Sequence, residues 1–157
     1  GQGPERSVHL PKRYREQLES SYAACYLKRA LGAFSAPSAG VTELSAKYDE
    51  RRQTLRLELE RIGSDLATRV ASEMRAPKAT PLSVAHADLP LSDAATEAAV
   101  GALRELGFFF AGLLPEYRDG DILRMQWLDG SVVVASAGAI ERDSTRAIEA
   151  FVLEDRP

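Results

Sequence analysis

Residues 102–128 read ALRELGFFFAGLLPEYRDGDILRMQWL and contain, in order, the end of an amphipathic helix, a dense apolar strand, a polar turn and a second strand. Gly107 follows the helical pattern at a position where helices often end in a left-handed residue, which glycine adopts without steric cost. The apolar run at 108–114 shows no polar alternation, so we predict a central strand buried on both faces. Gly120 favours a turn, and the strand after it is predicted to return antiparallel as a C-terminal β-hairpin.

The first part of the chain contains one helical pattern and two strand patterns. Apolar residues spaced by four, four and three predict a helix within residues 11–31, with Cys25 on its buried side. Two runs of period two, at 44–48 and 55–59, alternate apolar with polar residues and are joined by a short polar link. This pattern predicts an antiparallel hairpin with one buried face and one face in water.

The middle of the chain returns to alternating helices and strands. Ser64 is placed to cap a helix with a four-residue apolar repeat. A strand is predicted within residues 81–89, and Ser92 or Asp93 is predicted to cap the helix that leads to the opening stretch.

The end of the chain completes the pattern. The run SVVVAS at 131–136 indicates a further strand or the start of a tail, and STRAIEAFVLEDR at 144–156 indicates a short helix. Strands and helices that alternate this regularly, with hairpins among them, predict an α/β fold in which a mixed sheet carries helices on both faces. We expect a single domain over residues 1–157.

Composition excludes several functional classes. The 157 residues are 45% hydrophobic and 27% charged with a net charge of −3, so no excess of positive charge favours nucleic acid or an anionic membrane. No apolar run approaches the about 20 residues that a membrane span requires. The single cysteine fits a reducing compartment, and we expect a cytoplasmic protein. The chain begins Gly-Gln-Gly-Pro without an initiator methionine, so we expect a fragment of a larger protein.

Three motifs carry a resemblance to a known family: VHLPKRYREQLESSY at 8–22, DLPLSDAAT at 88–96 and LGFFFAGLLPEYRDGDILRMQWL at 106–128. Together they resemble a GNAT-like region of bacterial multidomain proteins, which join a kinase-like ATPase domain of the anti-sigma-factor type to segments of the GNAT N-acetyltransferase superfamily. The resemblance implies an acyl-CoA-binding fold whose cofactor is acetyl-CoA or another acyl-CoA, with no metal. It also implies partners among the other domains of the same polypeptide or a separate protein.

The resemblance directs attention to one strand-to-helix turn. Working GNAT transferases present the signature Q/R-x-x-G-x-G/A there, whose backbone N–H groups hold the CoA pyrophosphate. The corresponding turn at 60–67 reads ERIGSDLA, so the resemblance assigns cofactor contacts to Gly63 and Ser64. Asp65 puts a negative charge where the pyrophosphate would lie. We therefore expect a degenerate loop on a regulatory or binding module. The alternatives are an active acetyl-CoA-dependent N-acetyltransferase and a sensor of a small ligand.

Two residues are candidates for catalysis. His86 lies beside Asp88 in a strand pattern and titrates near neutral pH, which suits a general base; the alternative is a half-buried histidine hydrogen-bonded locally. In active GNAT enzymes a tyrosine in the C-terminal half often protonates the departing CoA thiolate, and the resemblance gives this role to Tyr117. The alternative is that its ring packs on the hairpin.

Other chemistry has little support in the sequence. The charged turn at 116–121 is predicted to be a solvated loop, because aspartate favours turns and a metal needs a defined set of oxygen ligands. The sequence contains no zinc-type Cys/His spacing, P-loop or nucleophile elbow.

Overall fold

The computed structural model describes residues 6–130 and 143–157, so the predicted strand at 131–136 lies outside the described residues. The elements in chain order are β1 (Ser7–Val8), the 3-10 helix η1 (Lys12–Tyr14), α1 (Arg15–Ala24), β2 (Ala30–Leu31), β3 (Glu43–Asp49), β4 (Thr54–Arg61), α2 (Leu66–Arg75), β5 (Val84–Pro90), α3 (Thr96–Glu105), β6 (Phe109–Leu114), β7 (Ile122–Leu128) and α4 (Asp143–Asp155).

A five-stranded mixed sheet in the order β3-β4-β5-β7-β6 forms the body of the protein, and β1 and β2 form a small parallel sheet beside it. β4 and β5 run parallel through the crossover helix α2, whereas β3–β4, β5–β7 and β6–β7 are antiparallel. The predicted mixed α/β class, the first hairpin and the C-terminal hairpin are therefore confirmed. The short polar links explain the hairpins, and the helix between β4 and β5 supplies the longer connection that parallel strands need.

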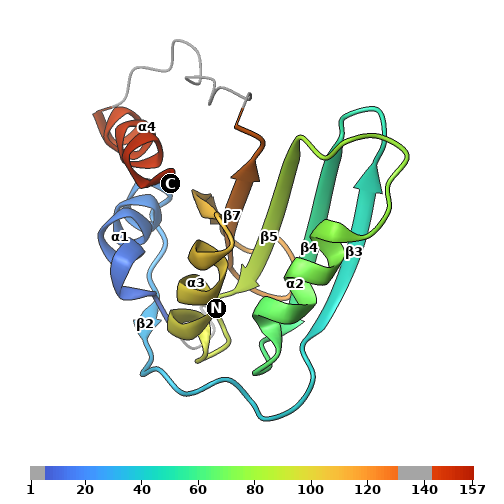
Figure 1. Ribbon diagram of the computed structural model, residues 1–157. Coiled ribbons are helices and arrows are strands. Elements are labelled where there is room, and N and C mark those ends of the chain that lie inside the picture. Colours follow the sequence, from blue (N-terminus) through green and yellow to red (C-terminus); the bar gives the residue numbers. More distant parts are fainter. Residues whose placement is uncertain (1–5, 131–142) are drawn as a thin grey trace.

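The two faces of the sheet differ in chemistry. α2 and α3 lie over one face (Figure 1), where Leu57, Ala87 and Met125 form a fully buried row across three strands. Period two then puts polar residues on the opposite face: Arg56 and Glu58 of β4, His86 and Asp88 of β5, and Arg124 and Gln126 of β7.

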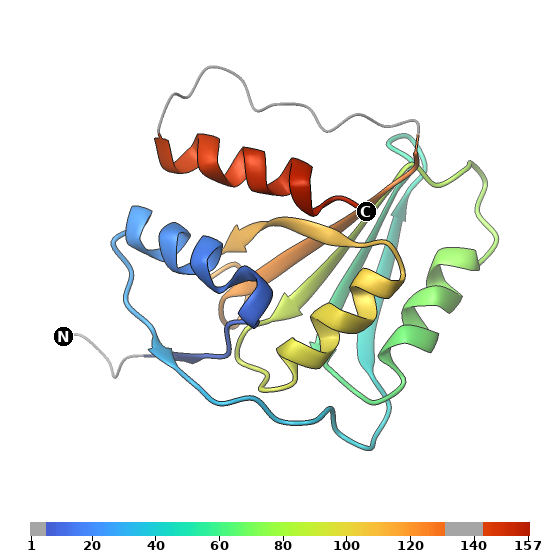
Figure 2. The ribbon, with the colours of Figure 1, turned by 60° about the vertical axis from the view of Figure 1, so that its left-hand side comes forward.

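The predicted position of the apolar strand was wrong, because β6 lies at the edge of the sheet and β7 separates it from β5. It is nevertheless buried, since α1 and α4 pack against it and against each other (Figure 2). The ring of Phe110 lies at a tilt to that of Tyr14, the residue directly before α1, and edge-on to that of Phe151 in α4, at centroid distances of 5.1 Å and 5.5 Å. Helices thus cover the strand edge that would otherwise be open to pairing with another chain.

A buried carboxylate joins these helices to β6. Asp155, near the end of α4, accepts hydrogen bonds from the Tyr14 hydroxyl (2.7 Å) and from the backbone N–H of Phe110 (2.8 Å). The guanidinium groups of Arg13 (2.9 Å) and Arg104 (2.8 Å) neutralise its charge. Burial, and then the bond to Asp155, raise the pKa of Tyr14, so this hydroxyl stays a donor.

The first helix ends at Ala24, earlier than predicted. Tyr26 adopts a positive φ of 57°, and the N–H of Leu27 bonds to the carbonyl of Tyr22 at 3.0 Å. This is a Schellman motif with tyrosine at the position that glycine usually occupies. The early end leaves Cys25 exposed rather than on a buried stripe, so that prediction was also wrong.

Of the remaining helix ends, the end of α3 agrees with the prediction and the two predicted N-caps do not. Gly107 has a φ of +95°, which confirms the left-handed end of α3. α2 begins after Asp65 without a side-chain cap, so the predicted Ser64 cap was wrong. The N-cap of α3 is Ala95, without a side-chain cap, so the predicted cap at Ser92 or Asp93 was wrong as well. Asp93 instead accepts from the N–H of that N-cap residue at 2.9 Å.

Replacing Asp155 with alanine should lower the free energy of unfolding by about 3–5 kcal/mol, because it leaves buried donors and two arginines without their acceptor. Urea denaturation measures this loss. Glu154→Ala, which removes the same charge from an exposed neighbour, should change stability by less than about 0.5 kcal/mol. Equal effects of the two variants would contradict the role of Asp155.

Replacing Tyr26 with glycine should leave the fold intact and raise the free energy of unfolding by up to about 1 kcal/mol, because left-handed backbone disfavours side chains. The lost ring contributes little packing, since Tyr26 is 95% exposed. Thermal denaturation tests this, with Tyr26→Ala as the control that keeps the strain. If Tyr26→Gly destabilises the protein more than Tyr26→Ala does, the backbone at this position is not strained.

Candidate functional site

The β4–α2 loop, which includes Gly63 and Ser64, lies at the carboxyl end of a parallel pair of strands. Three successive backbone N–H groups in this loop already have protein acceptors. The N–H of Ile62 donates to the carboxylate of Asp93 (3.1 Å), that of Gly63 to the hydroxyl of Thr42 (3.0 Å), and that of Ser64 to the carbonyl of Ser38 (2.9 Å). The donors that would hold a pyrophosphate are therefore occupied from within the protein.

Two of those acceptors belong to one segment, residues 32–42, which we call the strap. It runs between β2 and β3, below the carboxyl ends of β4 and β5 (Figure 1). The strap also bonds to the residues just before both neighbouring helices: the N–H of Ser35 donates to the carbonyl of Ala94, ahead of α3 (2.9 Å), and the N–H of Thr42 donates to the carboxylate of Asp65, ahead of α2 (2.7 Å). Its bonds to Thr42 lower the pKa of Asp65, so this carboxylate is charged at neutral pH.

Glycine is required at position 63 because the strap approaches so closely. A Cβ there would lie 2.5 Å from the carbonyl oxygen of Gly40 and 2.6 Å from the nitrogen of Thr42, both backbone atoms. The glycine that the sequence offers as a phosphate-loop residue thus has a packing reason of its own.

Tyr117 lies in the β6–β7 turn and is 44% exposed. Its ring faces the guanidinium of Arg124, 5.7 Å from the ring centroid. Arg124 in turn makes a two-pronged ion pair with Asp88, at 2.8 Å and 3.0 Å. Tyr117 therefore packs its ring against the hairpin, which is the alternative role that the sequence left open for it.

His86 lies on the same polar face of the sheet as Asp88 and Arg124. It lines a hollow of about 310 Å³ together with residues of β3, β4 and their connecting turn: Lys47, Tyr48, Asp49, Arg52, Thr54 and Arg56. Its Nδ1 is buried and has no partner among the described residues. Burial, followed by the charges of Arg124 and Arg56, lowers the pKa of His86, and Asp88 opposes this shift. The imidazole is therefore neutral at pH 7.

The four predicted site residues thus occupy three places: the loop under the strap, the turn over Arg124 and the cavity at His86. They do not form one constellation in this structure. An opening does exist between β4 and β5, because their pairing stops at Glu58 and Asp88 although both strands continue. A cavity of about 240 Å³ lies there, lined by Leu59, Glu60, Pro90, Ser92, Arg118, Asp119, Gly120, Asp121 and Ile122.

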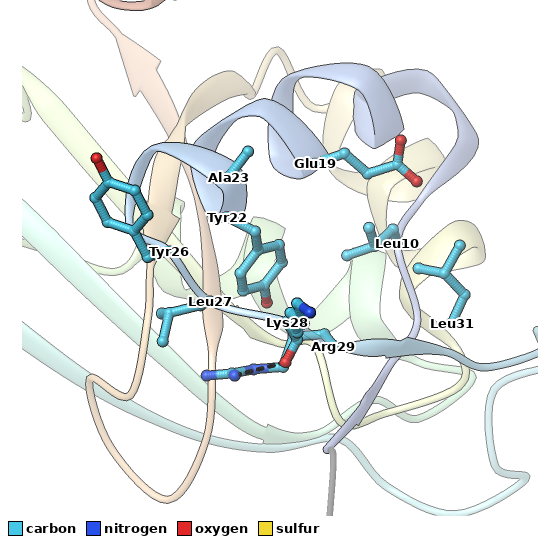
Figure 3. A pocket seen from close by; sticks show the side chains of 9 residues that line it. All are labelled: Leu10, Glu19, Tyr22, Ala23, Tyr26, Leu27, Lys28, Arg29 and Leu31. Carbon is cyan, nitrogen blue, oxygen red and sulfur yellow. Dashed lines mark hydrogen bonds between the residues drawn. The ribbon is translucent and has the colours of Figure 1, made fainter.

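A larger groove, of about 590 Å³, lies between α1 and the small parallel sheet (Figure 3). Tyr26 is at one end, and Leu10 and Leu31 are at the other. Tyr26 is 95% exposed and Leu31 is 49% exposed. The groove thus presents apolar side chains to solvent on a strained helix end, a combination that the sequence pattern did not indicate.

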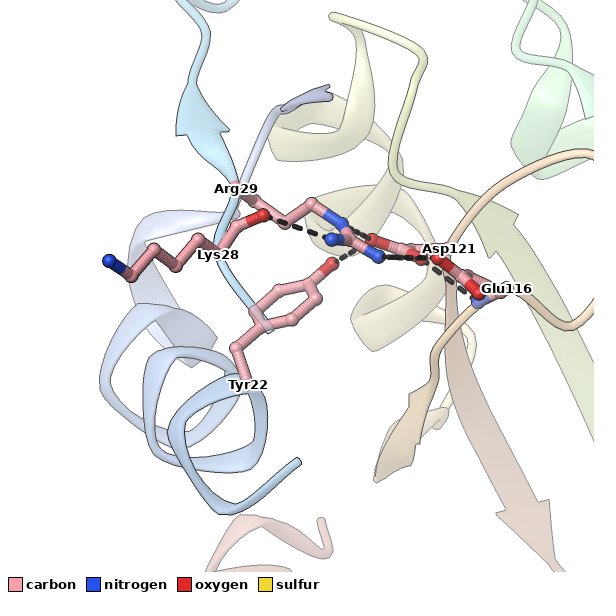
Figure 4. Close-up of polar contacts among 5 residues, drawn as sticks. All are labelled: Tyr22, Lys28, Arg29, Glu116 and Asp121. Carbon is pink, nitrogen blue, oxygen red and sulfur yellow. Dashed lines mark hydrogen bonds and ion pairs between the residues drawn. The ribbon is translucent and has the colours of Figure 1, made fainter. Parts of the chain in front are cut away.

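The wall of this groove is fixed by Asp121 (Figure 4). This buried carboxylate accepts from the Tyr22 hydroxyl (2.6 Å), from Arg29 Nε (2.7 Å) and from the backbone N–H of Glu116 (2.9 Å). Burial alone would raise its pKa, but the bonds from Arg29 and Tyr22 lower it. The prediction of a solvated turn was therefore wrong at Asp121, which is 3% exposed.

Sequence reasoning did not foresee the ion pairs that organise the polar face. Asp88–Arg124 and Arg118–Glu58, the latter at 3.4 Å, join residues far apart in the chain. The signal that could have found them is strand alternation: it puts His86 and Asp88 on one face of β5, and Arg124 and Gln126 on one face of β7.

Comparison with known proteins gives no match: no protein family matches this sequence, and no curated protein or solved structure does. Among the described residues, no three histidine, cysteine, aspartate or glutamate side chains gather in a way that could hold a metal ion. No helix in the described part of the chain combines the length and apolarity needed to cross a membrane.

Replacing Gly63 with alanine should destabilise the protein by about 1–3 kcal/mol, because the new methyl group meets backbone that cannot move away cheaply. Gly120→Ala is the matched control, since a Cβ there would meet no described atom within 4 Å. Chemical denaturation of both variants measures the difference. An unaffected Gly63→Ala protein would show that the strap does not lie against this loop.

Proposed function

We propose that this chain is a cytoplasmic, GNAT-like binding or regulatory module, acting on other domains of the same polypeptide or on a protein partner rather than transferring an acyl group. The observation that carries the proposal is the occupancy of the β4–α2 loop. Its N–H groups at Ile62, Gly63 and Ser64 bond to protein acceptors, and a pyrophosphate could bind them only after the strap and Asp93 had left.

The C-terminal hairpin supports the link to the GNAT superfamily. α3 ends at Glu105, the left-handed Gly107 leads directly into the buried strand β6, and β6 turns back into β7. This is the unit on which the sequence resemblance depends. Electrostatics supports the loss of conventional CoA binding, because Asp65 and Asp93 bring two carboxylates to the loop where a pyrophosphate needs positive or neutral surroundings.

A specific observation favours the alternative, an active acetyl-CoA-dependent N-acetyltransferase. β4 and β5 stop pairing after Glu58 and Asp88, and a cavity lies where they separate. Such an opening could receive the chain of an acyl-CoA, with Tyr117 on the adjoining turn as the acid. If the chain is a binding or regulatory module, as proposed, this cavity binds no cofactor.

Thermal denaturation with coenzyme A and acetyl-CoA separates the two functions. A ligand present at 100 times its Kd stabilises a protein by about 2.7 kcal/mol, which shifts the melting temperature by several degrees. We expect that neither ligand, at millimolar concentrations, shifts the melting temperature by binding to the β4–α2 loop. A saturable shift that Gly63→Glu abolishes would overturn the proposal.

Release of free thiol from acetyl-CoA in the presence of a panel of amines provides the second measurement. We expect no release above the uncatalysed rate. Release that is lost in Tyr117→Phe would establish the transferase and overturn the module, since this change removes the hydroxyl but keeps the ring over Arg124.

A further inference from the structure

Three basic side chains stand directly opposite one another on the polar face of the sheet. Lys47 of β3 pairs in register with Arg56 of β4, and Arg56 pairs in register with His86 of β5. Residues in register on adjacent strands hold their Cβ atoms about 4.5–5.5 Å apart, and like charges so placed are destabilising. Lys47 and Arg56 are therefore like charges in register, and the neutral His86 beside Arg56 does not balance them.

The contrast with the next row is direct. One step along the strands, Glu58 and Asp88 are balanced by Arg118 and Arg124. In the basic row, neither Lys47 nor Arg56 makes an ion pair within the described part of the chain. Asp49 lies in the same cavity wall, but it pairs with Arg52 at 3.8 Å.

Two buried polar atoms in this row also lack partners. Arg56 Nε and His86 Nδ1 are shielded from solvent and have no hydrogen bond within residues 6–130 and 143–157. Both side chains line the cavity of about 310 Å³ on this face. Buried polar groups in folded proteins nearly always have a partner, so a ligand in this cavity is the natural partner for these two atoms.

We propose that this cavity binds the phosphate group of a small phosphorylated molecule, with Arg56, Lys47 and His86 as its ligands. The three side chains converge from three strands, which matches an oxyanion with at least three acceptor oxygens better than a carboxylate with two. Arginine and lysine are the usual protein partners of phosphate. The cavity exceeds the size of the ion itself and leaves room for an organic substituent.

The site is separate from the β4–α2 loop, because it lies at the opposite end of β4 and β5, where their pairing begins at Thr54 and Val84. The inference therefore stands whether or not the proposed function is correct. Coenzyme A itself carries phosphates, so a CoA-induced shift lost in Arg56→Gln would report this cavity, whereas one lost in Gly63→Glu would report the loop.

An NMR titration of the ¹⁵N-labelled protein with inorganic phosphate tests the site, with sodium chloride at matched ionic strength as the reference. We expect saturable shifts in β3, β4 and β5, and an increase in the Kd of about tenfold or more in Arg56→Gln. Arg51→Gln, which removes the same charge from the adjoining exposed turn, should bind as the unchanged protein does. Equal weakening by both variants, or shifts that do not saturate, would overturn the proposal.

Acetate at the same concentrations distinguishes a phosphate site from a general site for carboxylates. Acetate shifts as large as those of phosphate would overturn the assignment to phosphate. The Arg56→Gln protein should fold normally, because the change removes a charge that Lys47 repels and keeps a polar side chain. Its melting temperature in sodium chloride should equal or exceed that of the unchanged protein.

The imidazole of His86 provides an independent readout. The charged groups on its face or around its cavity come from four strands and one turn. They are Lys47 and Asp49 of β3, Arg52 of the β3–β4 turn, Arg56 of β4, Asp88 of its own strand and Arg124 of β7. A phosphate dianion beside this ring should raise the pKa of His86, measured from its ring proton shifts, and the increase should vanish in Arg56→Gln. No increase at saturating phosphate would place the ion elsewhere and overturn the proposal.

Discussion

The fold depends on the carboxylate of Asp155. An edge strand as apolar as β6 is stable in water only if something covers its free side, and α1 and α4 do so. Asp155 holds them there, since it accepts from an N–H of β6, from Tyr14 at the start of α1 and from arginines on the 3-10 helix and on α3. A second pair, Tyr22 with Asp121, fixes the other end of α1 to the hairpin turn. Two tyrosine–aspartate pairs thus hold α1 in place, one directly before its first residue and one near its end.

The strap explains why residues 62–64 of the β4–α2 loop have no free backbone donors for a phosphate-bearing ligand. Parallel strands followed by helices bring helix N-termini to one edge of a sheet, where anions commonly bind. In this protein the same edge is filled by the chain itself: Ser38 and Thr42 satisfy the loop, and Asp93 supplies the negative charge. The features that make the edge suitable for an anion are used to hold residues 32–42 in place.

Strand alternation and helical spacing were sufficient to predict the fold class, both hairpins and the order of elements from β3 onward. They could not place β6, because an apolar strand at the centre of a sheet and one covered by helices at its edge have the same composition. They also missed the early end of α1, where Tyr26 occupies a position that favours glycine. The burial of Asp121 and Asp155 could not be predicted either. In the sequence each looks like an ordinary turn or tail residue, and its arginine and tyrosine partners come from distant parts of the chain.

The candidate site was likewise only partly predictable from the sequence. The sequence pointed to the β4–α2 loop and to His86, and both lie in places where unusual hydrogen bonding occurs. It could not show that the loop was occupied, since Thr42 and Asp93 come from segments about twenty to thirty residues away. Nor could it show that Lys47 and Arg56 stand in register with His86, because register depends on the pairing of three strands.

The position of Asp155 along the chain has a consequence for synthesis. Proteins are made from the N-terminus at about 5–20 residues per second, and β6 with its phenylalanines leaves the ribosome before the residue that secures its cover. During that interval all the described strands of the sheet have been made, but α1 covers β6 without α4 and without the carboxylate that holds them together. The same is true of any product truncated before α4, so in both cases the apolar edge of β6 is more open to pairing with another chain.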